Sequence, residues 1–216
     1  GKKLLCFHDQ QIGHVWSARS DGSNARQLTH DETLAGDPFL SPDGKQIAYY
    51  VQDVDYMSFT QEIWVVDRDG KNPRKITQLD STLRRPLWSP DGRWIACFSE
   101  NIRSARAHTF IVDPFGSDSP KPIGRGWPIA WRNTVEVVVF DSAHSWIVAL
   151  DGKSRRQFYK DSTRAIPVLG GNYIVYADWS KSRTGVWIVP TAGNSQPRQI
   201  LPKTGEYPFI ATNDRH

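Results

Sequence analysis

Residues 63–77 read Ile-Trp-Val-Val-Asp-Arg-Asp-Gly-Lys-Asn-Pro-Arg-Lys-Ile-Thr: an apolar run with an aromatic side chain, an Asp-Gly pair, and a basic-then-apolar run. Asp-Gly between two short apolar runs strongly indicates a β-hairpin, because glycine adopts the positive φ that tight turns require. The same phrase occurs at residues 15–29, where Trp16 leads into Asp21-Gly22 and then Arg26-Gln27-Leu28-Thr29. These stretches predict a repeated pair of antiparallel strands.

A proline motif recurs with a similar period along the chain. A proline stands before two mainly apolar residues at Pro38, Pro86, Pro128, Pro167 and Pro208. In two repeats a Ser-Pro-Asp-Gly turn follows, at residues 41–44 and 89–92, and leads into another apolar strand. Each repeat therefore predicts four strands over about 40–45 residues, which is the period of a β-propeller blade.

An aromatic residue occupies the same place in the third strand of every repeat. These residues are Trp16, Trp64, Phe110, Trp146 and Trp187. A side chain of this size buries about 150–250 Å², so we expect the aromatic residues to pack between neighbouring blades and to supply much of the core.

The two ends of the sequence complement one another. Residues 3–7 predict a second strand with no first strand before it, and residues 207–210 predict a first strand with no second strand after it. We expect an all-β β-propeller of four-stranded blades, with five blades and with the C-terminal strand closing the first blade. It would be a single domain over residues 1–216, with blades at 1–30 plus 206–216, 36–78, 84–124, 126–159 and 164–202. The alternative is a fragment of a six- or seven-bladed ring.

Composition and motifs narrow the class of function. The 216 residues carry a net charge of only +4, and the basic residues are spread through the repeats, so we expect no nucleic-acid binding. No apolar run is long enough to span a membrane, so we expect no membrane insertion. There is no G-x-S-x-G, H-E-x-x-H, phosphate-binding loop or dinucleotide fingerprint. We therefore predict no catalytic residues, no metal site and no cofactor, and expect a protein that is not an enzyme.

The topology of a propeller suggests where a partner would bind. The first strand of each blade lines the central channel, and the residues just before the aligned prolines mark its mouth. Trp, Tyr and Arg dominate binding hot spots, so a rim of this kind suits a protein or peptide partner; the alternative is that these residues pack between blades. The predicted mouth residues are Asp37, Arg85, Trp127 and Tyr207.

Two long loops on one predicted face add a second candidate surface. Apolar residues at a loop tip are typical of a contact surface, although these loops could instead fold back on their blades. The loop candidates are Tyr56, Met57, Phe59, Arg103 and Arg106.

The quoted repeats, above all Ser-Pro-Asp-Gly-Lys-Gln-Ile-Ala-Tyr at residues 41–49 and the phrase at 63–77, resemble the WD-repeat-like blades of the TolB propeller family. The resemblance is sharp over residues 12–123 and weaker beyond. It implies a scaffold or sensor module for partner binding, periplasmic or extracytoplasmic in a bacterium, and within a larger chain or an envelope complex. It also implies one alternative, the substrate-gating propeller of a serine peptidase or other hydrolase. A carbohydrate-binding or carbohydrate-active propeller is a third hypothesis; it predicts carboxylates on the first strands, where only Asp37 qualifies.

Overall fold

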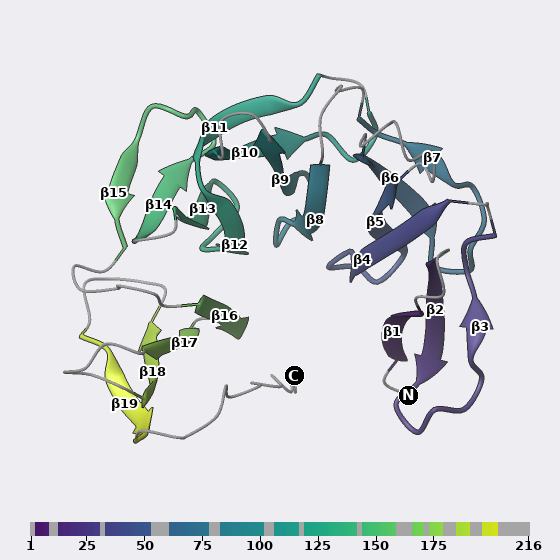
Figure 1. Ribbon diagram of the computed structural model, residues 1–216, viewed down its shortest axis with the longest axis horizontal. Helices are drawn as coiled ribbons and strands as arrows, with labels where there is room; N and C mark the ends of the chain where they lie inside the picture. The colour runs from purple at the N-terminus through teal and green to yellow at the C-terminus, as the bar shows by residue number, and fades with distance from the viewer. Residues whose placement is uncertain are drawn as a thin grey trace. The chain divides into compact units, whose positions relative to one another are not determined.

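The computed structural model describes residues 3–8, 13–30, 33–52, 61–77, 83–101, 106–116, 119–141, 144–158, 166–170, 173–178, 185–190 and 196–202. Within these ranges the secondary structure is entirely β, arranged in antiparallel sheets (Figure 1). No helix in the described part of the chain is long and apolar enough to cross a membrane. The chain divides into two compact units, Gly1–Pro122 and Ile123–His216.

The first unit contains the sheets that we call sheet 1 (β1-β2-β3), sheet 2 (β4-β5-β6-β7) and sheet 3 (β8-β9-β10-β11). In each sheet the strands pair in chain order, as expected for propeller blades. The last strand of sheet 3 crosses the boundary between the two units. The strands are β1 (Lys3–His8), β2 (His14–Arg19), β3 (Arg26–Gln27), β4 (Leu34–Leu40), β5 (Gln46–Gln52), β6 (Gln61–Asp67), β7 (Arg74–Lys75), β8 (Leu83–Trp88), β9 (Ile95–Asn101), β10 (Arg106–Val112) and β11 (Lys121–Arg125).

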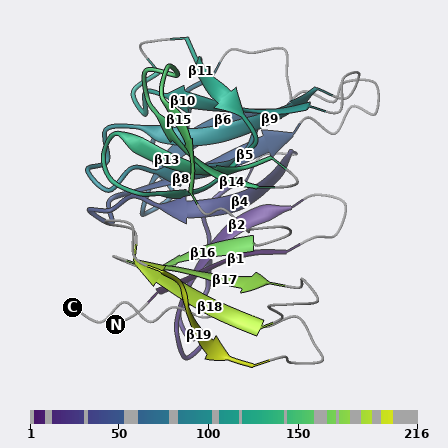
Figure 2. The same ribbon diagram turned by 90° about the vertical axis from the view of Figure 1, so that its left-hand side faces the viewer.

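The second unit contains sheet 4 (β12-β13-β14-β15) and sheet 5 (β16-β17-β18-β19). Figure 2 shows β16 to β19 following one another in chain order within sheet 5. The strands are β12 (Trp127–Trp131), β13 (Glu136–Phe140), β14 (Ser145–Ala149), β15 (Arg155–Gln157), β16 (Ile166–Gly170), β17 (Tyr173–Asp178), β18 (Gly185–Pro190) and β19 (Arg198–Leu201).

The predicted Ser-Pro-Asp-Gly turns join the first and second strands of sheets 2 and 3. Ser41 Oγ donates to Asp43 Oδ1 at 2.7 Å, and the same carboxylate oxygen accepts from the Lys45 backbone N–H at 3.1 Å. Gly44 completes the turn with φ +70°, a conformation that favours glycine. The turn at residues 89–92 repeats these bonds, so the local motif determines the local structure in both places.

Apolar clusters lie between adjacent sheets of each unit. Trp64 packs on a buried cluster that includes Val15 and Leu28 of sheet 1 together with Ile47 of sheet 2. Phe110 packs on a second cluster, which joins sheets 2 and 3, and Trp187 packs on a cluster that joins sheets 4 and 5. The expectation that these aromatic residues pack between neighbouring sheets is confirmed for Trp64, Phe110 and Trp187.

The all-β, propeller-like fold predicted from the repeats is confirmed. The closing strand was predicted within residues 206–216, which lie outside the described residues, so the five-bladed closed ring stays a prediction. The organisation as a single domain over residues 1–216 also stays a prediction. In the described part of the chain, sheet 1 contains β1, β2 and β3.

Candidate binding site

Two of the predicted mouth residues occupy equivalent places in neighbouring strands of the first unit. Asp37 lies in β4 and Arg85 lies in β8, and these first strands of sheets 2 and 3 are side by side (Figure 1). The pairing register of β4 with β5 shifts across Asp37, and the register of β8 with β9 shifts across Arg85. Each residue therefore lies in a β-bulge, where an extra residue redirects the side chains of a strand.

Both residues adopt a left-handed backbone conformation. φ is +47° at Asp37 and +51° at Arg85. This conformation brings Cβ too close to the carbonyl oxygen and costs a residue other than glycine about 1–2 kcal/mol. Such strain persists only where the surrounding structure imposes it, and it concentrates at functional sites. The two bulges thus single out Asp37 and Arg85 from the other residues of their strands.

The charges of Asp37 and Arg85 are available to a partner. Asp37 is half-buried and Arg85 is exposed. Among the residues that the structure describes, neither side chain forms an ion pair or a hydrogen bond. In the part of the chain that the structure describes, a carboxylate and a guanidinium therefore stand unneutralised on adjacent strands.

A buried glutamine anchors the strand that carries Arg85. Gln61, at the start of β6, is only 2% exposed, and its Oε1 accepts a hydrogen bond from Arg84 Nε of sheet 3. Its Nε2 donates to Gln52 Oε1 of sheet 2. A buried amide is stable only with partners of this kind. Sequence reasoning missed this chain of bonds, because Gln52, Gln61 and Arg84 come from three separate strands and carry no motif.

Trp127 begins β12 of the second unit and has a different environment. Its indole stacks on the ring of Phe140, with centroids 5.9 Å apart and an interplanar angle of 26°. The preceding Gly126 has φ +113°, and a Cβ there would lie 2.7 Å from the carbonyl oxygen of Phe140. Trp127 is thus half-buried on its own sheet.

The remaining predicted site residues are not placed. Tyr56, Met57, Phe59, Arg103 and Tyr207 lie outside the described residues. Arg106 is the first residue of β10, and only its backbone is described. The long-loop surface therefore stays a prediction.

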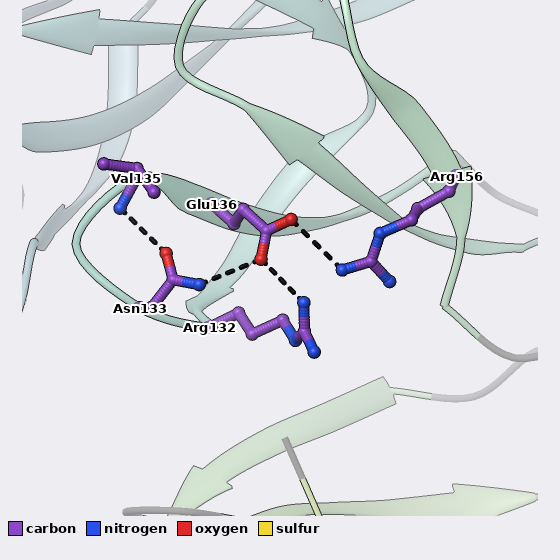
Figure 3. A network of polar contacts seen from close by, with 5 residues as sticks. All are labelled: Arg132, Asn133, Val135, Glu136 and Arg156. Carbon is purple, nitrogen blue, oxygen red and sulfur yellow. Dashed lines mark hydrogen bonds and ion pairs between the residues drawn. The ribbon is translucent and has the colours of Figure 1, made fainter. Parts of the chain in front are cut away.

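A polar network in the second unit closes the turn between β12 and β13 (Figure 3). The Glu136 carboxylate lies between two guanidiniums, with Arg132 Nη1 at 2.6 Å and Arg156 Nη2 at 3.1 Å, and accepts from Asn133 Nδ2 at 2.9 Å. Burial raises the pKa of Glu136, but the hydrogen bonds from Asn133 and Arg132 and the nearby positive charges outweigh it and lower the pKa overall. Glu136 is therefore a fixed carboxylate that holds the turn together.

A second carboxylate of sheet 4 is neutralised in a similar way. Asp141 Oδ2 accepts from Trp146 Nε1 at 2.6 Å and from Arg155 Nη2 at 2.8 Å. The Arg155 guanidinium also lies 4.3 Å from the centroid of the Trp146 ring, close enough for a cation–π contact. These bonds fasten the third and fourth strands of the sheet to the loop that follows β13.

Comparison with known proteins identifies the fold of this chain but not its family. No family profile matches the sequence. No curated protein matches it either. Solved structures, however, do match.

A puromycin-hydrolysing peptidase of Mycobacterium tuberculosis matches 96% of this chain with a TM-score of 0.71 and 14% identity, over 36% of its own length. The β-propeller domain of the Trilobed protease from Pyrococcus furiosus matches 92% with a TM-score of 0.63 and 16% identity, over 67% of its length. A TolB-like protein from Agrobacterium tumefaciens matches 83% with a TM-score of 0.61 and 15% identity, over 66% of its length.

Likeness at this level of identity shows a β-propeller fold alone, because one fold hosts many functions. The chain spans between about one third and two thirds of the length of several of the proteins that it matches.

Proposed function

We propose that this chain is a non-enzymatic interaction module that binds a protein or peptide segment across β4 and β8. One observation carries the proposal: Asp37 and Arg85 occupy equivalent bulges, adopt a strained left-handed backbone and carry opposite charges without a partner in the described chain. The two long loops, which the sequence predicts as a second contact surface, belong to the same proposal.

The chemistry of the pair defines the partner that it would accept. A guanidinium binds a carboxylate through two parallel hydrogen bonds, and a carboxylate accepts from an ammonium or guanidinium group. A segment with an acidic and a basic group spaced to match β4 and β8 satisfies both residues at once, whereas a segment of one sign is repelled by one of them. Complementary charges of this kind give specificity more than raw affinity.

The cellular setting belongs to the same proposal. Similarity to a TolB-like structure, together with the repeats at residues 41–49 and 63–77, supports a TolB-like scaffold or sensor that acts in the periplasm of a bacterium. Such a module would form part of a larger chain or of an envelope complex.

A second candidate is the substrate-gating propeller of a larger peptidase. It is favoured by the structural likeness to a puromycin-hydrolysing peptidase and to the propeller domain of the Trilobed protease. In that case Asp37 and Arg85 would contact the substrate peptide as it passes, and the catalytic residues would be supplied by another part of the protein.

Selection from a random peptide library displayed on phage tests the proposal. We expect the wild-type chain to enrich segments that carry both an acidic and a basic residue. The doubly neutral variant Asp37→Asn/Arg85→Asn should bind the enriched peptides at least about tenfold more weakly. Asparagine suits this purpose because it tolerates the left-handed conformation.

Arg93→Gln is the matched control, since it removes one exposed charge from a turn of sheet 3 outside the two bulges. Equal binding by the wild type and the double variant would refute the role of Asp37 and Arg85. Failure to enrich any sequence would favour the gate, which must pass many peptides without retaining one.

A further inference from the structure

A hollow of about 310 Å³ lies in the first unit, where the hairpin turn of sheet 2 meets the last strands of sheet 1. Its walls come from β2, the turn between β2 and β3, β3 itself, and the turn between β6 and β7. Apart from the buried Ser17, the lining side chains are exposed. The lining residues are Ser17, Asn24, Arg26, Arg68 and Asp69.

At the corresponding junction, between sheets 2 and 3, an arginine side chain forms a hydrogen bond to the neighbouring sheet. Arg74 is the equivalent of Arg26 one repeat later, and its Nη2 donates to the carbonyl oxygen of Pro114 at 2.9 Å, in the turn of sheet 3. Pro114 is in turn the equivalent of Arg68. In the described chain Arg26 makes no hydrogen bond of this kind, so its guanidinium is left at the hollow.

Within the described residues, the Asn24 side chain also lacks the hydrogen bond that its equivalent in sheet 2 makes. Its equivalent in sheet 2, Asn72, donates from Nδ2 to Asp67 Oδ2 at 2.7 Å. In sheet 1 the place of Asp67 is taken by Arg19, which offers no acceptor. Within the described residues the Asn24 amide makes no hydrogen bond, and both its donor and its acceptor face a site with two arginines.

Ser17 adds a hydroxyl where sheet 2 has an apolar side chain. Its equivalent, Val65, is fully buried in the cluster between sheets 2 and 3. Ser17 is 8% exposed, and in the part of the chain that the structure describes its hydroxyl has no hydrogen-bond partner. A nearly buried hydroxyl that lines a hollow is a ready partner for a polar ligand.

The one carboxylate in the hollow is already compensated. Asp69 accepts from the Lys71 backbone N–H at 3.1 Å and pairs with Lys71 Nζ at 3.3 Å. The backbone hydrogen bond from Lys71 is the main cause of a lowered pKa, with further contributions from the charges of Lys71 and Arg26. Within the described residues, the Arg68 side chain makes only a long contact, 3.5 Å, from Nη1 to the Gly44 carbonyl oxygen. Because Asp69 already pairs with Lys71, the hollow keeps a net positive charge from Arg26 and Arg68 among the described residues.

We propose that this hollow binds a small oxyanion, a phosphate or a carboxylate, carried by a ligand with hydroxyl groups. Arg26 and Arg68 would hold the oxyanion, because a guanidinium matches the geometry of phosphate and carboxylate oxygens. Asn24, Ser17 and the Asp69 carboxylate would hydrogen-bond to the hydroxyl groups. A volume of about 310 Å³ is at the lower end for ligand pockets, which are about 300–1,000 Å³, and therefore fits a ligand the size of one phosphorylated or acidic sugar.

Isothermal titration of the 216-residue chain tests the site at constant ionic strength. The probes are inorganic phosphate, glucose 6-phosphate, glucuronate and neutral glucose. We expect saturable binding of at least one anionic probe and tighter binding of a hydroxylated anion than of inorganic phosphate. Glucose should not bind. The comparison of glucose 6-phosphate with glucuronate decides between phosphate and carboxylate.

Three variants locate the binding. Arg26→Gln and Arg68→Gln should each weaken it about tenfold. Ser17→Val, which copies the residue of sheet 2, should weaken it without any change of charge. Arg93→Gln removes the same charge elsewhere and should leave the affinity within a factor of two. Circular dichroism and the melting temperature of each variant confirm that it folds.

The proposal is overturned if none of the anionic probes gives saturable binding to the wild type. It is also overturned if Arg93→Gln weakens binding as much as Arg26→Gln, which would mean attraction to net charge alone. Because none of these variants touches Asp37 or Arg85, the result is independent of the peptide selection described above.

Discussion

The side chain of Arg74 reaches from the last strand of sheet 2 to the backbone carbonyl of Pro114 in the hairpin turn of sheet 3, with 2.9 Å between Nη2 and O. The bond joins two sheets whose strands do not pair with one another. Arg26, at the same place one repeat earlier, makes no such bond within the described residues.

Arg74→Ala should therefore destabilise the protein by about 1.5 kcal/mol, the contribution of a hydrogen bond from a charged donor. Arg26→Ala, measured without added anions, should change the free energy of unfolding by less than about 0.5 kcal/mol. Urea unfolding followed by tryptophan fluorescence measures both. Equal losses would show that the two arginines do the same structural work.

Glycine at either bulge should raise the stability of the protein and weaken peptide binding, because it relieves the backbone strain and removes the charged side chain. Asp37→Gly and Arg85→Gly remove a left-handed penalty of about 1–2 kcal/mol, partly offset by the larger entropy of an unfolded chain with glycine. Each variant should be more stable than the wild type by about 0.5–1 kcal/mol and should bind selected peptides more weakly. Arg85→Val should lose stability, since a β-branched residue is the least suited to positive φ. A glycine variant less stable than the wild type would show that no strain is stored there.

Two glycines that both have positive φ should respond very differently to alanine. At Gly126, with φ +113°, the added Cβ would lie 2.7 Å from the Phe140 carbonyl oxygen, whereas at Gly22, with φ +80°, it would meet nothing within 4 Å. Gly22→Ala should cost about 1 kcal/mol from the backbone conformation alone. Gly126→Ala should cost about 3 kcal/mol or more, because the clash adds to the strain. Thermal unfolding of both variants gives the comparison.

The Glu136 network should make stability depend on pH in a defined direction. Its pKa is lowered from the ordinary value of 4.5 in the folded state, so the unfolded chain binds the proton more readily. The stabilisation is complete above about pH 4.5 and is lost as the pH falls through the folded-state pKa.

Glu136→Gln should therefore be less stable than the wild type at pH 7, and the difference should shrink toward pH 3. Urea unfolding at a series of pH values measures it. A difference that stays constant from pH 7 to pH 3 would mean that the charge of Glu136 contributes nothing.

Local sequence alone was enough to predict the strands and turns of the repeats. Asp69-Gly70 and Ser41-Pro42-Asp43-Gly44 form the expected turns, because their bonds join residues at most five positions apart. The packing of the third-strand aromatic residue was predicted correctly for Trp64, Phe110 and Trp187, since alternation along a strand decides which face a residue occupies.

The sequence predicted Asp37 and Arg85 as mouth residues, but only the tertiary structure showed that both lie in bulges with positive φ. Positive φ at Asp37 and Arg85 is imposed by the bulged pairing of β4 with β5 and of β8 with β9, which involves residues of separate strands. Arg26 and Arg74 stand in the same local motif, yet one lines a hollow and the other closes a junction. Their difference arises from the turn of the next sheet, about 40 residues further along the chain. Local motifs therefore determined the strands and turns, whereas contacts between sheets decided which side chains remain free to bind.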